Sequence, residues 1–126
     1  MNFSAHGNIE FLIQHKCVVN KPNTGFNEEG VNKLFSYILE QVKEKQLDKW
    51  ILIEILGADA LPTPEALISL TDNYKKAKEL GCIKIVTVCE NSLQNQFIKR
   101  AAEEAKVDIC CYSSENEALE HNKQFL

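Results

Sequence analysis

Arginine is nearly absent from this sequence: thirteen of the fourteen basic residues are lysines, and the exception is Arg100. Capture of a phosphate or carboxylate by a fork of two hydrogen bonds depends on arginine, so an anion site here would have to rely on backbone amides. The formal net charge is -4. Because binding to phosphate backbones requires clustered positive charge, we expect no nucleic-acid partner.

Long apolar runs and low-complexity stretches are also missing. The longest apolar run, WILIEIL at 50–56, is far too short to cross a bilayer, and the first ten residues, MNFSAHGNIE, contain no basic segment followed by an apolar one. We therefore expect a cytoplasmic protein without a transmembrane segment. With 126 residues, 44% hydrophobic and 25% charged, the chain is predicted to form a single domain over 1–126.

Neither cysteines nor histidines occur with the spacing of a metal or redox motif, so we expect no metal and no cofactor. The five cysteines are predicted to be buried free thiols, with the adjacent pair on opposite faces of one strand. No glycine-rich phosphate loop is present, and no serine is accompanied by a histidine and an acid that would activate it, so we expect no enzyme. The residues concerned are Cys17, Cys82, Cys89, Cys110, Cys111, His6, His15 and His121.

Hydrophobic periodicity predicts the element order β-β-α-β-α-β-α-β-α. A hairpin opens the chain, and strands then alternate with helices, which implies parallel pairing and an α/β fold with a mixed five-stranded sheet. The run at 50–56 is expected to be the central strand, since it is apolar on both faces. The predicted strands are 9–14, 17–22, 50–56, 82–89 and 107–113, and the predicted helices are 27–46, 64–80, 93–106 and 115–125.

Local signals mark several helix ends. Asn27 is expected to cap the first helix, Thr63 precedes Pro64 at the start of the second, and Gly81 provides a stop for that helix. Ser114, followed by Glu117, forms a capping box for the last helix.

Three segments give the chain a resemblance to a known fold. GFN at 25–27 leads into the first helix, ILIEILGADAL at 51–61 is the central strand with its exit loop, and YSSENEAL at 112–119 opens the last helix. In this order they resemble the STAS domain, the fold of bacterial anti-sigma-factor antagonists (SpoIIAA-like proteins) and of the cytoplasmic tails of sulfate transporters. The resemblance covers nearly the whole chain and implies a non-catalytic regulatory module.

Signalling members of that family have D-x-S-G or D-S-S-G after the central strand, and a partner kinase phosphorylates the first serine. Thr63 falls at or next to that serine, and Pro62 occupies the acidic position. The motif is therefore absent, as in stand-alone divergent members. Thr63 is a phosphoacceptor candidate by resemblance, and by position it is equally suited to be only a helix cap, because both roles use the same helix amides.

Ligands of parallel α/β sheets bind beyond the carboxyl ends of the strands. The sequence places a polar group of residues there, which is either an anion or partner site or, for the strand-end carboxylate of Glu54, a charge satisfied by loop amides. Cys89, between a strand and a helix, could be a stabilised thiolate, but C-x5-R is missing and we expect no catalysis. The binding-surface candidates are Glu54, Asp59, Pro62, Thr63, Glu65, Cys89 and Ser92.

From these features we expect a protein-binding module whose partner surface is the loop 57–66 with the following helix, and whose partner is a regulatory kinase or an anti-sigma-like factor. An alternative is a carrier of a lipid or another small apolar molecule, because some STAS-like proteins without the phosphorylation motif are compared with SEC14-type lipid-binding folds. The edge strand FLIQ at 11–14 would be protected by a homodimer or a partner strand.

Overall fold

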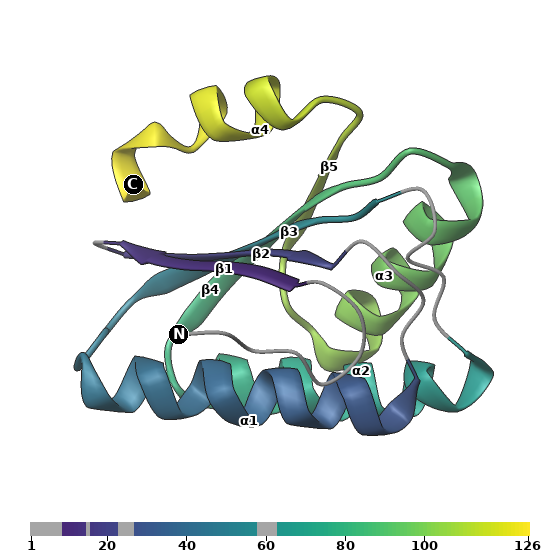
Figure 1. The fold of residues 1–126 in the computed structure, drawn as a ribbon, viewed down its shortest axis with the longest axis horizontal. Coiled ribbons are helices and arrows are strands. Elements are labelled where there is room, and N and C mark those ends of the chain that lie inside the picture. The colour runs from purple at the N-terminus through teal and green to yellow at the C-terminus, as the bar shows by residue number, and fades with distance from the viewer. Residues whose placement is uncertain (1–8, 15, 23–26, 58–62) are drawn as a thin grey trace.

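The computed structural model describes residues 9–14, 16–22, 27–57 and 63–126 (Figure 1). In these residues, five strands and four α-helices follow one another in the order predicted from the sequence, and a 3-10 turn comes after them. Their bounds are β1 (Ile9–Gln14), β2 (Cys17–Pro22), α1 (Glu28–Glu44), β3 (Trp50–Ile55), α2 (Pro64–Glu79), β4 (Cys82–Val88), α3 (Ser92–Ala105), β5 (Ile109–Tyr112), α4 (Glu115–His121) and η1 (Lys123–Phe125).

The strands form one sheet in the order β1-β2-β3-β4-β5. β2 to β5 are parallel, and β1 pairs antiparallel with β2 at one edge. The predicted α/β class is confirmed, and β3 lies in the middle of the sheet as expected. The predicted strand 107–113 shortens to the four residues of β5, and the predicted last helix divides at Asn122, whose backbone N–H bonds the Leu119 carbonyl at 3.2 Å.

Helices cover both faces of the sheet. Figure 1 shows α1, α2 and α3 on one side and α4 with η1 on the other. Because successive strand residues point to opposite faces, the core forms two clusters. The larger lies under the three helices and includes Val18, Leu52 and Ile85. The smaller lies under α4 and includes Ile51 and Ile53.

Side-chain caps begin all four α-helices at the same edge of the sheet, since each helix follows the carboxyl end of a parallel strand. Asn27 Oδ1 accepts from the Gly30 amide at 2.9 Å, which confirms the predicted cap of α1. Thr63 and Ser114 cap α2 and α4, and for the predicted capping box the structure shows Ser114 Oγ accepting from the Glu117 amide at 3.3 Å. Asn91, which the sequence reading did not single out, caps α3 by accepting from the Gln94 amide at 2.8 Å.

Gly81 ends the α2–β4 turn with φ at +101°, a conformation that favours glycine. A Cβ at this position would lie 1.8 Å from the Asp48 carbonyl oxygen, so the close approach to the segment before β3 also requires glycine. The Gly81 carbonyl in turn accepts from the Trp50 amide at 3.1 Å. The predicted helix stop is confirmed, and the turn sets where β3 begins.

The α4–η1 segment is tied to the strands by polar contacts. The Lys16 amide donates to the Phe125 carbonyl at 3.1 Å, and the Lys84 Nζ donates to Asn122 Oδ1 at 2.7 Å. Lys21 Nζ also lies 3.0 Å from Glu115 Oε2. These contacts attach the carboxyl-terminal elements to β2 and β4, across the smaller cluster.

The cysteines are all free thiols, but the expectation that all are buried is wrong. Cys17, Cys82 and Cys89 are buried, whereas Cys110 is half-buried and Cys111 is exposed. The reason is that β5 is a short edge strand, which the helices on either side cover only in part. Burial raises the pKa of both Cys17 and Cys82 to about 12, so these two thiols are protonated and unreactive at neutral pH.

Candidate functional site at the carboxyl edge of the sheet

Thr63 is the first predicted site residue at this edge. Its Oγ1 accepts from the Ala66 amide at 3.3 Å, and Pro64 occupies the first helical position. The side chain is half-exposed, so the hydroxyl combines a capping role with access from solvent. The cap is confirmed, while phosphorylation of Thr63 stays a prediction.

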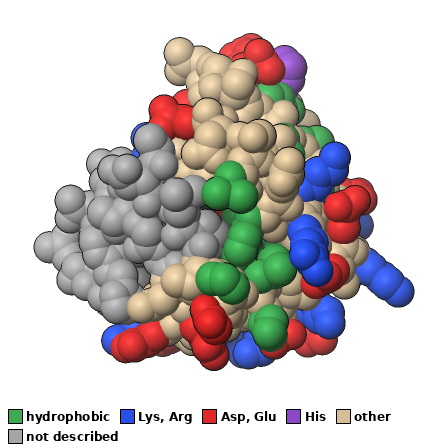
Figure 2. All heavy atoms as spheres, turned by 90° about the vertical axis from the view of Figure 1, so that its right-hand side faces the viewer, with side chains coloured by type: hydrophobic (Ala, Val, Ile, Leu, Met, Phe, Trp, Pro, Cys, Tyr) green, Lys and Arg blue, Asp and Glu red, His purple; other side chains and the backbone are tan. Residues whose placement is uncertain are grey.

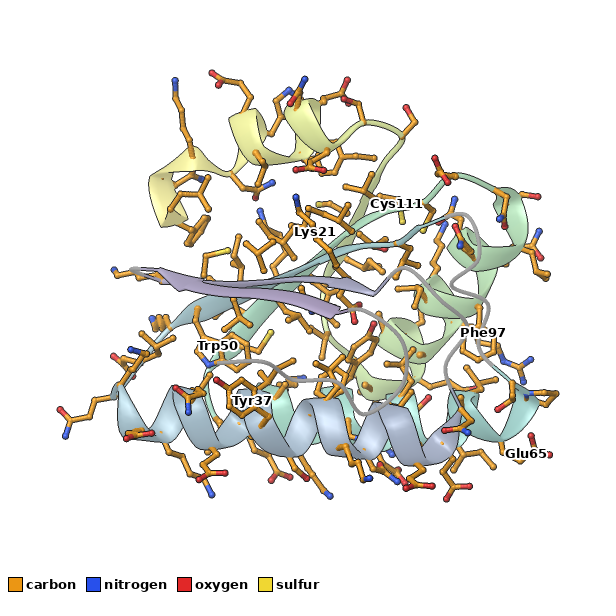
Figure 3. All side chains as sticks on the ribbon, viewed as in Figure 1. Lys21, Tyr37, Trp50, Glu65, Phe97 and Cys111 are labelled. Atoms are coloured by element: carbon orange, nitrogen blue, oxygen red, sulfur yellow. The ribbon has the colours of Figure 1, made fainter. Side chains whose placement is uncertain are left out.

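Thr63 and Glu65 line a hollow of about 880 Å³ together with residues of α1. Four carboxylates and one lysine belong to its described lining, so the hollow carries net negative charge. Lys33 Nζ lies 3.1 Å from Glu29 Oε1 in the next turn of α1. Tyr37, the half-buried aromatic ring of this lining, and Glu65 are labelled in Figure 3. The carboxylates are Glu28, Glu29, Glu40 and Glu65.

Cys89 and Ser92 line a different, smaller hollow of about 420 Å³ with Glu90, Tyr112 and Glu117. The structure therefore divides the predicted polar group at the edge into two parts. Burial raises the pKa of the Cys89 thiol, and a hydrogen bond with the Thr87 hydroxyl, 3.4 Å away, offsets only part of this effect. Burial therefore opposes the thiolate form that the position of Cys89 between a strand and a helix could favour.

Glu54 is not a surface residue of this edge. Its side chain is 4% exposed and points under α2, where its Oε1 accepts a hydrogen bond from the Tyr74 hydroxyl. Neither expected role is found, since a buried side chain cannot line a partner surface and the carboxyl group is satisfied by a helix side chain instead of loop amides. Burial raises its pKa from 4.5 to about 7, and the hydrogen bond from Tyr74 opposes this increase.

Asn20 belongs to the same buried layer, and the sequence analysis missed it. It pairs in register with Glu54, which pairs in register with Thr87 on β4. All three side chains therefore lie in one row on the face under the helices. Asn20 is fully buried, and neither polar atom of its side chain has a hydrogen-bond partner in the part of the chain that the structure describes. The signal was available: Asn20 is two residues after Val18, and a period of two places both on one face.

Gln94 is a second buried polar residue that the sequence did not reveal. Its Nε2 donates to the Gly57 carbonyl at 2.7 Å, and its Oε1 accepts from the Glu90 amide at 3.1 Å. The side chain is fully buried. It joins the exit of β3 to the start of α3 and so fixes the spacing of the two loops. Such a bridge between distant segments leaves no periodic signal in the sequence.

Large apolar side chains are exposed on the helices that begin at this edge. Ile68 on α2 is 69% exposed and Leu93 on α3 is 61% exposed, and both helices pack against each other. Figure 2, which faces this edge, shows hydrophobic side chains gathered between charged ones. Phe97, labelled on α3 in Figure 3, and Leu67 are half-buried and pack on the larger core cluster. We call Leu67, Ile68, Leu93 and Phe97 the α2–α3 patch.

Two of the predicted surface residues, Asp59 and Pro62, lie outside the described residues. Within the described ranges, no group of three or more His, Cys, Asp or Glu side chains could hold a metal ion. None of the described helices has both the length and the apolar character needed to cross a bilayer.

The chain matches no family model and no curated protein. Among solved structures, it is similar to the NMR structure of the protein TM1081, with a TM-score of 0.61 and 16% sequence identity over 98% of this chain and 95% of that one. The likeness extends over the whole fold. At this level of identity it concerns the arrangement of helices and strands, and function has to be argued from the residues at the edge.

Proposed function

We propose that the protein is a non-catalytic, protein-binding regulatory module of the STAS or anti-sigma-factor antagonist type, with its partner surface on residues 57–66 and α2. The observation that carries the proposal is the α2–α3 patch beside the cap of α2. Exposed apolar groups framed by charges are typical of a surface that a protein partner covers. The element order and the segments quoted above support the STAS type by resemblance.

The charges at the same edge of the sheet indicate what the partner presents. Glu65 on α2 and Glu28 and Glu29 on α1 stand at the same edge, and all three are exposed. A partner with an apolar centre and basic residues at its rim would be complementary, and the charges would act mainly on the rate of association and on specificity. A regulatory kinase or anti-sigma-like factor with such a surface fits the proposal.

Thr63 is the proposed point of control. A phosphate on its hydroxyl would lie at the positive end of α2, where helix amides favour an anion, and close in sequence to Glu65, which repels it. Phosphorylation would thus add negative charge at the rim of the partner surface. Because Thr63 is followed by proline where the signalling motif has serine or glycine, the kinase would have to accept a stiffer substrate loop than the family offers.

The direct test is affinity capture of a partner from extracts of the native cells. We expect the wild-type protein to recover a specific partner, and the double substitution Ile68→Asp with Leu93→Asp to lose it. The matched control is Ile83→Asp, because Ile83 is also exposed, at 42%, but lies at the start of β4, away from the carboxyl edge. Equal capture by both variants, or no specific partner for the wild type, would argue against the proposal.

A carrier of a small molecule is the second candidate. The hollow beside Thr63, at about 880 Å³, falls within the range of ligand sites. Its carboxylates favour a cationic or polar ligand over an apolar lipid, so the SEC14-like alternative has the weaker support. Native mass spectrometry of freshly purified protein separates the candidates, since a carrier would retain a ligand mass that denaturation removes.

A homodimer through the amino-terminal edge remains part of the proposal. β1 pairs only with β2 in the described sheet, which leaves its other edge available for strand addition. Sedimentation analysis would show a dimer at micromolar concentration. A cytoplasmic location likewise stays a prediction, to be tested by fractionation.

A further inference from the structure

Three buried side chains meet between β2, β3 and α2, behind the proposed partner surface. Asn20 and Tyr74 are fully buried and Glu54 is 4% exposed. Figure 1 shows β2 and β3 side by side, with α2 in the layer beneath them. Tyr74 donates from α2 to the carboxyl group on β3, so this hydrogen bond joins the helix to the centre of the sheet.

Glu54 has no basic partner to offset its charge among the described residues that influence its pKa. Tyr74 of α2 donates a hydrogen bond to it, Thr87 lies beside it in register on β4, and the thiols of Cys82 and Cys89 interact with it electrostatically. The apolar residues that α1 and α3 contribute to the surrounding cluster include Phe35 and Ile98. Loss of the proton would therefore leave a buried carboxylate that only hydrogen-bond donors can stabilise.

Asn20 offers such a donor at the right place. Its in-register position on the adjacent parallel strand puts the two backbones about 4.8 Å apart with both side chains on the same face. Its amide nitrogen has no partner in the described part of the chain, which costs roughly 1–3 kcal/mol for a buried polar group. The donor thus lies one strand spacing from the carboxyl group, on the same face of the sheet.

We propose that Asn20, Glu54 and Tyr74 form a proton-responsive unit in which the Asn20 amide is idle while Glu54 is protonated and donates to the carboxylate once the proton leaves. The proton passes to solvent, and the hydrogen bond from Tyr74 is kept in both forms. The unit lets the sheet accept a charge beneath α2 without releasing the helix. This inference goes beyond the proposed function and does not depend on it.

The pKa of Glu54, raised by burial to about 7, means that both forms are populated near neutral pH. A modest change in pH would then change the number of hydrogen bonds between β2 and β3 below α2. Because the change is internal, the described surface keeps its shape while the stiffness of the layer under α2 alters.

Carbon-13 NMR of the Glu54 carboxyl group and nitrogen-15 NMR of the Asn20 side-chain amide, recorded against pH, test the unit directly. We expect both resonances to titrate with one common midpoint somewhat below 7, because the pKa of about 7 reflects burial and the Tyr74 hydrogen bond without a donor from Asn20. In Asn20→Leu, the midpoint of Glu54 should increase by about one to two pH units, because a hydrogen bond to a charged group is worth about 1.5–3 kcal/mol. An Asn20 resonance that stays constant through the Glu54 titration would overturn the inference.

Thr87→Val provides the matched control, since Thr87 is the in-register neighbour of Glu54 on the other side. Its hydroxyl is engaged with the Cys89 thiol, so we expect little change in the Glu54 midpoint. If Asn20→Leu and Thr87→Val change the Glu54 midpoint equally, Asn20 acts only as one more polar neighbour and not as a specific donor, which would contradict the proposal. Glu54→Gln tests the link without altering β2: the Asn20 resonance should then lose its titration.

Discussion

The two faces of the sheet are built from the same strands but differ in polarity. On the α4 side, the buried positions of β2, β3 and β4 are all apolar, namely Cys17, Val19, Ile51, Ile53, Val86 and Val88. On the side of α1, α2 and α3, each of these strands carries an apolar residue followed two positions later by a polar one. The pairs are Val18 and Asn20, Leu52 and Glu54, and Ile85 and Thr87.

The α4 face serves stability, whereas the buried polar groups of the opposite face have to be explained in another way. On the α4 face the buried strand side chains contribute by apolar burial, at roughly 25 cal/mol for each Å² removed from water, and the polar contacts of Lys16, Lys21 and Lys84 lie around them. The opposite face accepts the cost of buried polar groups in one row near the carboxyl edge, beside the segment where we place the partner surface. Polar groups retained in a core without full satisfaction need an explanation other than stability.

The largest effect is expected from placing an amide on the apolar face. Ile53→Asn removes a fully buried aliphatic side chain, a change that costs about 2–5 kcal/mol for truncation, and leaves an unsatisfied polar group that costs about 1–3 kcal/mol more. Urea unfolding should show a protein that is unfolded or barely stable. Ile53→Val, expected to cost about 0.5–1.5 kcal/mol, is the control for side-chain size. If Ile53→Asn is as stable as Ile53→Val, both faces of the sheet accept a buried polar side chain and the contrast between them is wrong.

The next effect concerns pH. The folded protein holds the pKa of Glu54 at about 7, against 4.5 when the side chain is exposed, so the folded state binds the proton more tightly. Stability from this group is therefore fully present below pH 4.5 and is lost as the pH rises to 7 and beyond. Each difference of one in pKa corresponds to about 1.4 kcal/mol, which makes the loss on the order of 3 kcal/mol.

Denaturant unfolding of the wild type and of Glu54→Gln between pH 4.5 and 8 isolates this contribution. The wild type should lose stability relative to the variant as the pH rises. If the free energies of unfolding of the two proteins change in parallel with pH, Glu54 does not titrate in this range. The buried polar row would then not make the helix-covered face sensitive to pH.

Asn20→Leu makes the polar face more similar to the apolar one. At pH 5, where Glu54 is protonated, we expect a gain of about 1 kcal/mol, because an unsatisfied buried amide is removed. The gain should disappear by pH 8, since the carboxylate then lacks its donor. Thermal unfolding at the two pH values measures this difference. An equal gain in stability at both would show that the effect of Asn20→Leu does not depend on the charge of Glu54.

The smallest effect is expected at the edge itself. Thr63→Ala removes the cap of α2 and should cost about 1 kcal/mol, whereas Thr63→Ser should cost little because its hydroxyl can cap the helix. Chemical unfolding of the three proteins gives the comparison. If both substitutions also leave binding to a captured partner unchanged, Thr63 is a cap and no more.

The fold was largely predictable because its signals are local and periodic. The apolar run of β3, the helical spacing in α1 and α2, and the caps Asn27, Thr63 and Ser114 each act over a few residues. The errors fall where tertiary surroundings decide the outcome. β5 is shorter than predicted and exposes Cys111, because an edge strand has no neighbour on one side, and strand position within a sheet is not encoded in a local pattern.

The site was predictable only in part. Position along the chain correctly placed Thr63 at the start of α2, but it could not show that Glu54 points under α2 toward Tyr74, twenty residues away. The roles of Asn20 and Gln94 depend on strand register and on contacts between distant loops. Such pairings emerge only when the whole sheet is assembled, and they account for the misplaced role of Glu54.

The agreement between strand order and chain order has a consequence for biosynthesis. As the polypeptide leaves the ribosome, each new strand can add beside the one made just before it, and α1, α2 and α3 can cover their face as they emerge. The other face has to wait for α4 and η1, whose contacts with Lys16 and Lys84 close it. Until residues 115–125 emerge, the nascent chain carries a bare apolar sheet, which makes this interval the one in which a chaperone would be needed.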